Sequence, residues 1–121
     1  MTGVSTAGVA GFIFGMSQCG VVCEQTGTVV TFAVEACTGP LAGQPVQTGV
    51  GVEELAMWPA VPPHWVHLPA TITLTPTNPN YDGTLPGWVR HSRQIVAWGD
   101  ATEPAQAWLG HIRGVLTQAS Q

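Results

Sequence analysis

Lysine is absent from this chain of 121 residues, and arginine occurs only three times, first at Arg90. The 89 residues before it therefore carry neither of the two side chains that most often neutralise phosphate. Nucleic acids and anionic membranes are bound through surfaces rich in these two residues. Seven acidic residues bring the formal net charge to −4. We expect neither nucleic acid nor a membrane as a partner.

Cysteine is also scarce, and the three present are Cys19, Cys23 and Cys37. An odd number leaves a free thiol in an oxidising compartment, so the composition favours a reducing cytoplasm. A zinc site needs four ligands, usually in closely spaced pairs, and the first histidine is only at His64. Burial as small apolar side chains explains the cysteines better. With no phosphate-binding or dinucleotide fingerprint either, the sequence predicts no metal and no cofactor.

Long hydrophobic runs are missing as well. The most apolar stretch, Val9–Met16, has eight residues, two of them glycine, whereas a membrane-spanning helix needs about 20. The cationic start of a secretory signal is also absent. The composition, 45% hydrophobic and 8% charged, is typical of a folded chain with its own core. We expect residues 1–121 to form one cytoplasmic domain.

Several segments are predicted from their periodicity. Glycine recurs through residues 1–20, so a helix is not expected there, and the segment is left open between a strand, a short arm and a mobile lead-in. Glu-Gln-Thr-Gly at 24–27 has the composition of a turn. Residues 28–35, 46–52 and 65–75 alternate as half-buried strands do. Within the third run, a proline at position 69 indicates an edge or a break.

A helix is expected to close the chain. Thr102 is a plausible N-cap, and apolar residues recur at helical spacing over 108–119. Gly110 and Gly114 are four apart, which would let the helix lie close against a sheet. Residues 76–87 have the composition of a long loop. The fold class is α+β, an antiparallel β-meander packed on a C-terminal helix. The residues predicted to form the core are Phe32, Val34, Val66, Leu68, Ile72 and Ile112.

Two patches hold the side chains most suited to chemistry. Residues 88–98 fit neither period, and they contain Arg-His-Ser-Arg at 90–93 beside two tryptophans. Arginine binds carboxylates through two parallel hydrogen bonds and stacks on indoles, which suits an internal network or recognition of an acidic terminus. His67 falls on the polar face of the third strand, where it would line a groove. His64 faces the other side, so the two rings do not share one metal ion.

The sequence resembles a known family at residues 58–63, Trp-Pro-Ala-Val-Pro-Pro. The ubiquitin-conjugating (E2) fold carries a Tyr-Pro-x-x-Pro-Pro turn between its third and fourth strands. Four further patches resemble bacterial proteins of the E2/UBC family in the same order: 62–69, 87–93, 98–100 and 108–116. The resemblance covers about residues 27–117, and it implies a UBC-like fold for the whole domain.

The E2 family also has a His-Pro-Asn element, followed a few residues later by the cysteine that holds the modifier as a thioester. Here Asn78-Pro79-Asn80 stands at about that place, and an asparagine there would stabilise the oxyanion of the tetrahedral intermediate. No cysteine follows. Thr84 is the only hydroxyl of comparable size, and an unactivated hydroxyl is a far weaker nucleophile than a thiolate. The long N-terminal helix usual in E2 proteins is not evident.

These observations predict a non-catalytic E2-like domain. The resemblance implies a ubiquitin-like protein or an E1-like enzyme as its partner in a bacterial modification system. Two alternatives stay open: a small hydrolase or transferase that uses His67, His91 or Ser92 below the 76–87 loop, and a self-assembling structural module. The residues predicted to bind are Asn78, Asn80, His67, Trp88, Arg90, His91, Ser92 and Arg93.

Overall fold

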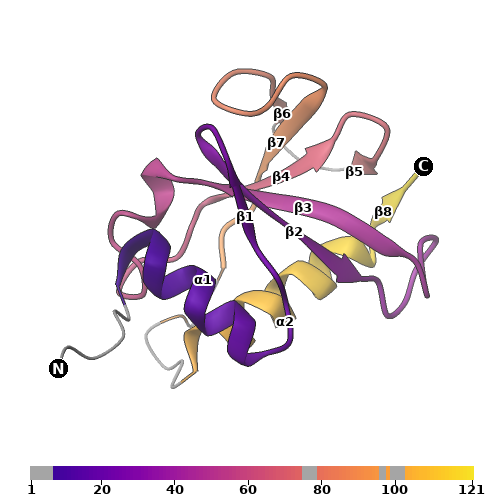
Figure 1. Ribbon diagram of the computed structural model, residues 1–121. Helices are drawn as coiled ribbons and strands as arrows, with labels where there is room; N and C mark the ends of the chain where they lie inside the picture. Colours follow the sequence, from indigo (N-terminus) through magenta and orange to yellow (C-terminus); the bar gives the residue numbers. More distant parts are fainter. Residues whose placement is uncertain (1–6, 75–78, 96–97, 99–102) are drawn as a thin grey trace, which may run out of the picture.

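The computed structural model describes residues 7–74, 79–95, 98 and 103–121. Its elements, in chain order, are α1 (Gly8–Gln18), β1 (Glu24–Thr26), β2 (Val29–Glu35), β3 (Pro45–Gly51), a 3-10 turn η1 (Glu53–Leu55), β4 (Trp65–Pro69), β5 (Thr73–Leu74), β6 (Pro79–Asn80), β7 (Trp88–Ser92), α2 (Pro104–Leu116) and β8 (Ala119–Ser120). Six strands form one antiparallel sheet in the order β1-β2-β3-β4-β7-β6. β5 and β8 pair separately, and Figure 1 shows both helices below the large sheet.

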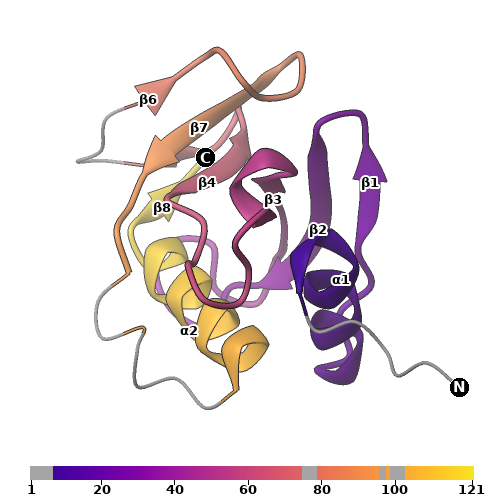
Figure 2. The ribbon, with the colours of Figure 1, turned by 90° about the vertical axis from the view of Figure 1, so that its left-hand side faces the viewer.

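The α+β fold class and the antiparallel sheet are therefore confirmed. Figure 2, which views the molecule from the side, shows β1 and β6 at opposite edges of the sheet. The core lies between the sheet and the two helices, and all six residues predicted for it are at most 7% exposed. Among the described segments, neither helix has the length and apolar character that a membrane span requires.

The prediction for the N-terminus was wrong, because residues 8–18 form the helix α1. Phe12 and Met16, one helical turn apart, are completely buried. The Phe12 ring lies 4.9 Å from the Trp58 ring and 5.8 Å from the Phe32 ring, measured between centroids. Most helical stability in proteins comes from such packing rather than from intrinsic propensity. The glycines of α1 are thus tolerated because this face of the helix is anchored in the core.

The first three strands form two successive hairpins. The expected turn at 24–27 is instead the strand β1, and the chain reverses at Gly27, whose φ of 59° suits glycine. β2 and β3 pair over their whole length, from Val29 opposite Gly51 to Glu35 opposite Pro45. The strands predicted at residues 28–35 and 46–52 are confirmed to within one residue at each end. The alternation holds only in part for β3, because Gly49 and Gly51, expected on the open face, are buried.

The third predicted strand is shorter than expected. β4 ends at Pro69, where the sequence indicated a break, and β5 pairs instead with β8 at the end of the chain. The predicted loop 76–87 contains the two residues of β6, and the segment that fitted neither period contains β7. β7 lies between β4 and β6, so this segment carries part of the sheet.

The closing helix is confirmed as α2, preceded by Glu103 at the N-cap; Thr102 lies outside the described residues. Its end was predicted too late, because Ala119 belongs to β8. The expected close approach through Gly110 and Gly114 is wrong. Both glycines are exposed, and a Cβ on either would have no atom within 4 Å. Apolar side chains of the opposite face, Trp108 and Ile112 among them, pack on the sheet instead.

Candidate functional site

The candidate site lies on the sheet face turned away from the helices. The register aligns four residues in one row across four strands: Gly49 pairs with His67, His67 with Arg90, and Arg90 with Asn80. Paired residues of antiparallel strands point to the same face. The neighbouring pairs of Val66 with His91 and Leu68 with Val89 point to the opposite face, toward the core. The row thus collects His67, Arg90 and Asn80, three of the residues predicted to bind.

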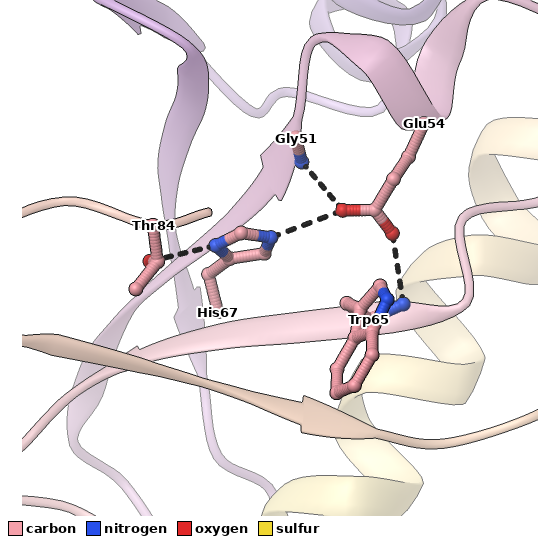
Figure 3. Close-up of polar contacts among 5 residues, drawn as sticks. All are labelled: Gly51, Glu54, Trp65, His67 and Thr84. Atoms are coloured by element: carbon pink, nitrogen blue, oxygen red, sulfur yellow. Dashed lines mark hydrogen bonds and ion pairs between the residues drawn. The ribbon is translucent and has the colours of Figure 1, made fainter. Parts of the chain in front are cut away.

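His67 is the centre of this row and is completely buried. A buried polar ring needs hydrogen-bond partners, and Figure 3 shows one at each ring nitrogen. Nδ1 lies 2.8 Å from Oγ1 of Thr84, and Nε2 lies 3.1 Å from Oε2 of Glu54. Glycine at position 49 leaves room for the His67 side chain. A Cβ there would lie 3.3 Å from the Cβ of His67 and 2.8 Å from Cγ1 of Val29.

Glu54 is held by the backbone on its other sides. Its Oε2 also accepts a hydrogen bond from the amide of Gly51 at 3.1 Å, and its Oε1 accepts one from the amide of Trp65 at 2.9 Å. Gly51 permits this approach, because a Cβ there would lie 2.6 Å from Oε2. An ionised carboxylate only accepts hydrogen bonds, so Nε2 of His67 must be the donor in this contact. In the neutral ring, Nδ1 is then the acceptor that faces the Thr84 hydroxyl.

Thr84 belongs to the loop between β6 and β7, which folds over the row. The preceding residue, Gly83, has a φ of 68° and packs so closely on Arg90 that a Cβ would lie 2.8 Å from its Cζ. The guanidinium of Arg90 lies over the Trp65 ring, 4.5 Å from its centroid, a typical cation–π contact. Next to these groups is a cavity of about 210 Å³, and its lining residues are Thr28, Gly51, Glu53, Glu54, Gly83 and Arg90.

A second contact between a histidine and a hydroxyl lies just before the start of β4. Nε2 of His64 is 2.5 Å from Oγ of Ser92, beside a cavity of about 350 Å³ that includes Pro62, Pro63 and Trp98 in its wall. His64 and His67 have different hydrogen-bond partners among the described residues. No carboxylate is bonded to His64 in the described part of the chain, so this pair lacks the acid that His67 has.

The four residues of the 90–93 patch have different surroundings in the structure. Arg90 lies in the row with His67, and Ser92 contacts His64, whereas His91 is buried on the core face. Burial lowers the pKa of His91, and the nearby charge of Arg93 lowers it further. Arg93 donates from Nη2 to Oε1 of Gln118, 2.5 Å away. These four residues therefore have different partners, and their role in binding stays a prediction.

Two further predicted residues, Trp88 and Asn80, have contacts within the sheet and its loop. Trp88 is half-buried and pairs with Pro69 at the end of β4. Asn80 accepts a hydrogen bond from the amide of Asp82 at 2.7 Å through its Oδ1, so that oxygen shapes the loop. Asn78 lies outside the described residues. Among the described residues, no group of three or more histidine, cysteine or acidic side chains is arranged to hold a metal ion.

Sequence reasoning missed two members of the site. Glu54 was not singled out, although its position three residues after Gly51 places it at the first turn after a strand. Thr84 was considered only as an unactivated hydroxyl, whereas the structure places it against the acceptor nitrogen of a histidine. Comparison with known proteins finds no matching family model, no significantly similar curated protein and no significantly similar solved structure.

Proposed function

We propose that this chain is an E2-like cytoplasmic domain that acts as a non-catalytic interaction partner in a bacterial ubiquitin-like modification system. The order of its elements supports this proposal: a helix, a four-strand antiparallel meander from β1 to β4, and a closing helix. The proline-rich turn at 58–63 lies between β3 and β4, where the resemblance places it. The partner would be a ubiquitin-like protein or an E1-like enzyme.

The position of the cysteines supports a role without a thioester. All three precede residue 38, whereas the segment that matches the E2 catalytic region begins at Asn80. Cys37 follows β2, and β3, β4 and β7 separate β2 from β6 in the sheet. Burial raises the pKa of the Cys23 thiol to about 12, which keeps it protonated at neutral pH. A thiolate is the nucleophile that thioester formation requires.

The test combines binding with adduct formation. The full chain is incubated with an E1-like enzyme, ATP and the matching ubiquitin-like protein, and it is also titrated with each protein separately. We expect measurable binding to one of them and no adduct that dithiothreitol releases. A dithiothreitol-labile band that disappears in a Cys37→Ser variant would overturn the non-catalytic role. Absence of binding to every E1 and ubiquitin-like pair tested would count against the partnership.

A second candidate function is a small hydrolase or transferase, and one observation favours it. Glu54, His67 and Thr84 form a continuous chain from acid to imidazole to hydroxyl, with contacts of 3.1 and 2.8 Å. This is the order of groups that activates a hydroxyl for acyl transfer. The ring is reversed relative to serine proteases, in which Nδ1 faces the acid and Nε2 faces the hydroxyl. Either nitrogen of a neutral imidazole can be the base, provided the other is protonated.

This candidate predicts weak esterase activity toward p-nitrophenyl acetate above the rate of denatured protein. His67→Gln removes the base while keeping a side chain that can form hydrogen bonds. General-base catalysis contributes about 10²–10⁴-fold, so the variant should lose activity by roughly that factor. An equal rate in the wild type and in a folded His67→Gln variant would exclude this function for the site. No observation in the described residues favours the third alternative, self-assembly.

A further inference from the structure

We propose that the hydroxyl of Thr84 is an acyl-accepting nucleophile, activated by His67 and able to hold a short acyl group as an oxygen ester. This inference rests on the second candidate function, and it names the reacting atom and the substrate class. Thr84 is half-buried, whereas His67 is completely buried, so Thr84 is the residue of the pair that is partly open to solvent.

The proton positions follow from the hydrogen bonds around Glu54. This carboxylate accepts from the amides of Gly51 and Trp65, so all its contacts are with donors and Nε2 of His67 carries a proton. In the neutral ring, the lone pair of Nδ1 therefore points at Oγ1 of Thr84, 2.8 Å away. The two backbone amides also fix the carboxylate, and the carboxylate fixes the ring. The base is thus held in orientation before any substrate arrives.

The reaction has two balanced steps. In the first, Oγ1 of Thr84 attacks the carbonyl carbon of an ester or thioester, and its proton passes to Nδ1 of His67. The bond from the carbonyl carbon to the leaving group breaks, and the leaving group takes the proton from Nδ1. In the second, water attacks the threonine ester, gives one proton to Nδ1, and releases the carboxylic acid as Oγ1 recovers that proton. An amine in place of water would take the acyl group as an amide.

The space proposed for the acyl group is the cavity lined by Glu54, the partner of His67, and by Gly83, the residue before Thr84; Thr84 and His67 do not themselves line it. Its volume of about 210 Å³ is below the range of roughly 300–1,000 Å³ that holds drug-sized ligands, so an acyl chain of a few carbons is favoured. Arg90 contributes the only cation in the lining, and its buried Nε has no hydrogen-bond partner among the described residues. Glu53 and Glu54, in the same wall, disfavour substrates with a negative charge.

The first measurement uses the wild-type chain and p-nitrophenyl acetate. Mass spectrometry of quenched, digested protein should locate an acetyl group on Thr84, and stopped-flow traces should show a burst of p-nitrophenol before the steady state. This readout needs no variant, so it does not depend on whether a substituted chain folds. Acetyl found only at other residues, with hydrolysis intact, would overturn the inference.

Variants give a second, independent readout. Thr84→Val keeps the shape of the side chain and should lose the adduct and at least about 100-fold in rate, whereas Thr84→Ser should retain both. Thr31→Val is the matched control, since it removes a threonine hydroxyl whose partner within the described residues is the carbonyl of Glu24. If folded Thr84→Val hydrolyses at the wild-type rate and His67→Gln does not, water is the nucleophile and only this inference fails. If the wild type shows no hydrolysis, the second candidate function fails with it.

Discussion

Replacing Glu54 by glutamine should destabilise the fold far more than its small chemical change suggests. Oε2 accepts from Gly51 and His67, and Oε1 accepts from Trp65. A glutamine amide has one oxygen, so its NH2 group must face at least one of these donors. A hydrogen bond to a charged group contributes about 1.5–3 kcal/mol, and a stranded buried donor costs about 1–3 kcal/mol. We expect Glu54→Gln to lower the free energy of unfolding by about 2–4 kcal/mol.

The assay is urea unfolding followed by tryptophan fluorescence, with Glu53→Gln as the control. Glu53 is the exposed neighbour in the same 3-10 turn, so its substitution changes net charge equally and should stay within about 0.5 kcal/mol of wild type. Equal m-values would show that the two variants unfold from comparable states. If Glu54→Gln matches Glu53→Gln, the carboxylate does not hold the network, and the proton positions argued for His67 lose their basis.

The remaining predictions concern the core, the pH dependence and two glycines. Ile112→Ala should destabilise by about 2–5 kcal/mol, because the side chain is completely buried against the sheet; an unchanged melting temperature would contradict this packing. Burial lowers the folded-state pKa of His91 and His111 below the ordinary 6.5, so the unfolded chain binds more protons at acidic pH. The free energy of unfolding should therefore have its full value above about pH 6.5 and should fall as the pH drops below that value. In urea titrations at several pH values, His111→Gln should reduce the slope of the free energy of unfolding against pH. Gly110→Ala should stabilise the fold by about 0.5–1 kcal/mol, because the position is exposed in a helix and an added Cβ has free space. Gly83→Ala should destabilise the fold, because the φ of Gly83 is 68° and a Cβ would collide with Arg90. Thermal melts of the two variants test both predictions.

Periodicity predicted the central strands and the closing helix because one face of each is buried. β2 alternates between buried and open positions, and α2 buries apolar side chains at helical spacing. The same reasoning failed for α1, where glycine content argued against a helix. Packing of Phe12 on Trp58 and Phe32 decides that case, and Trp58 is 46 residues away in the chain. Local sequence does not show such long-range contacts.

β7 was missed for a different reason. Its alternation is real, since Val89 and His91 face the core and Trp88, Arg90 and Ser92 do not. The residue types disguise the pattern, because a histidine occupies a core position and a tryptophan an open one. Hydrophobic periodicity is calculated from residue types and not from burial. A strand with a histidine on its core face and a tryptophan on its open face therefore shows no clear two-residue period.

The candidate site was predicted only in part, because sequence patterns show which face a residue occupies but not which strands become neighbours. The period of β4 correctly placed His67 opposite the core. Its partners come from positions 13 residues before and 17 residues after it. Their meeting depends on two hydrogen-bonded registers, Gly49 with His67 and His67 with Arg90, and on a loop that returns over the sheet. A shift of one residue in either register would turn the ring to the other face.

A structural role and a chemical role make different demands on the same three side chains. To fasten the β6–β7 loop to the sheet, the site needs hydrogen bonds at both ends of the His67 side chain, and glutamine can supply some of them. To activate Thr84, it needs a ring that takes up and releases a proton, which glutamine cannot do. Stability and acyl transfer measured on one His67→Gln sample therefore separate the two roles. A stable variant in which Thr84 is no longer acylated supports a chemical role for His67. A variant that loses stability but in which Thr84 is still acylated indicates that His67 only holds the β6–β7 loop on the sheet.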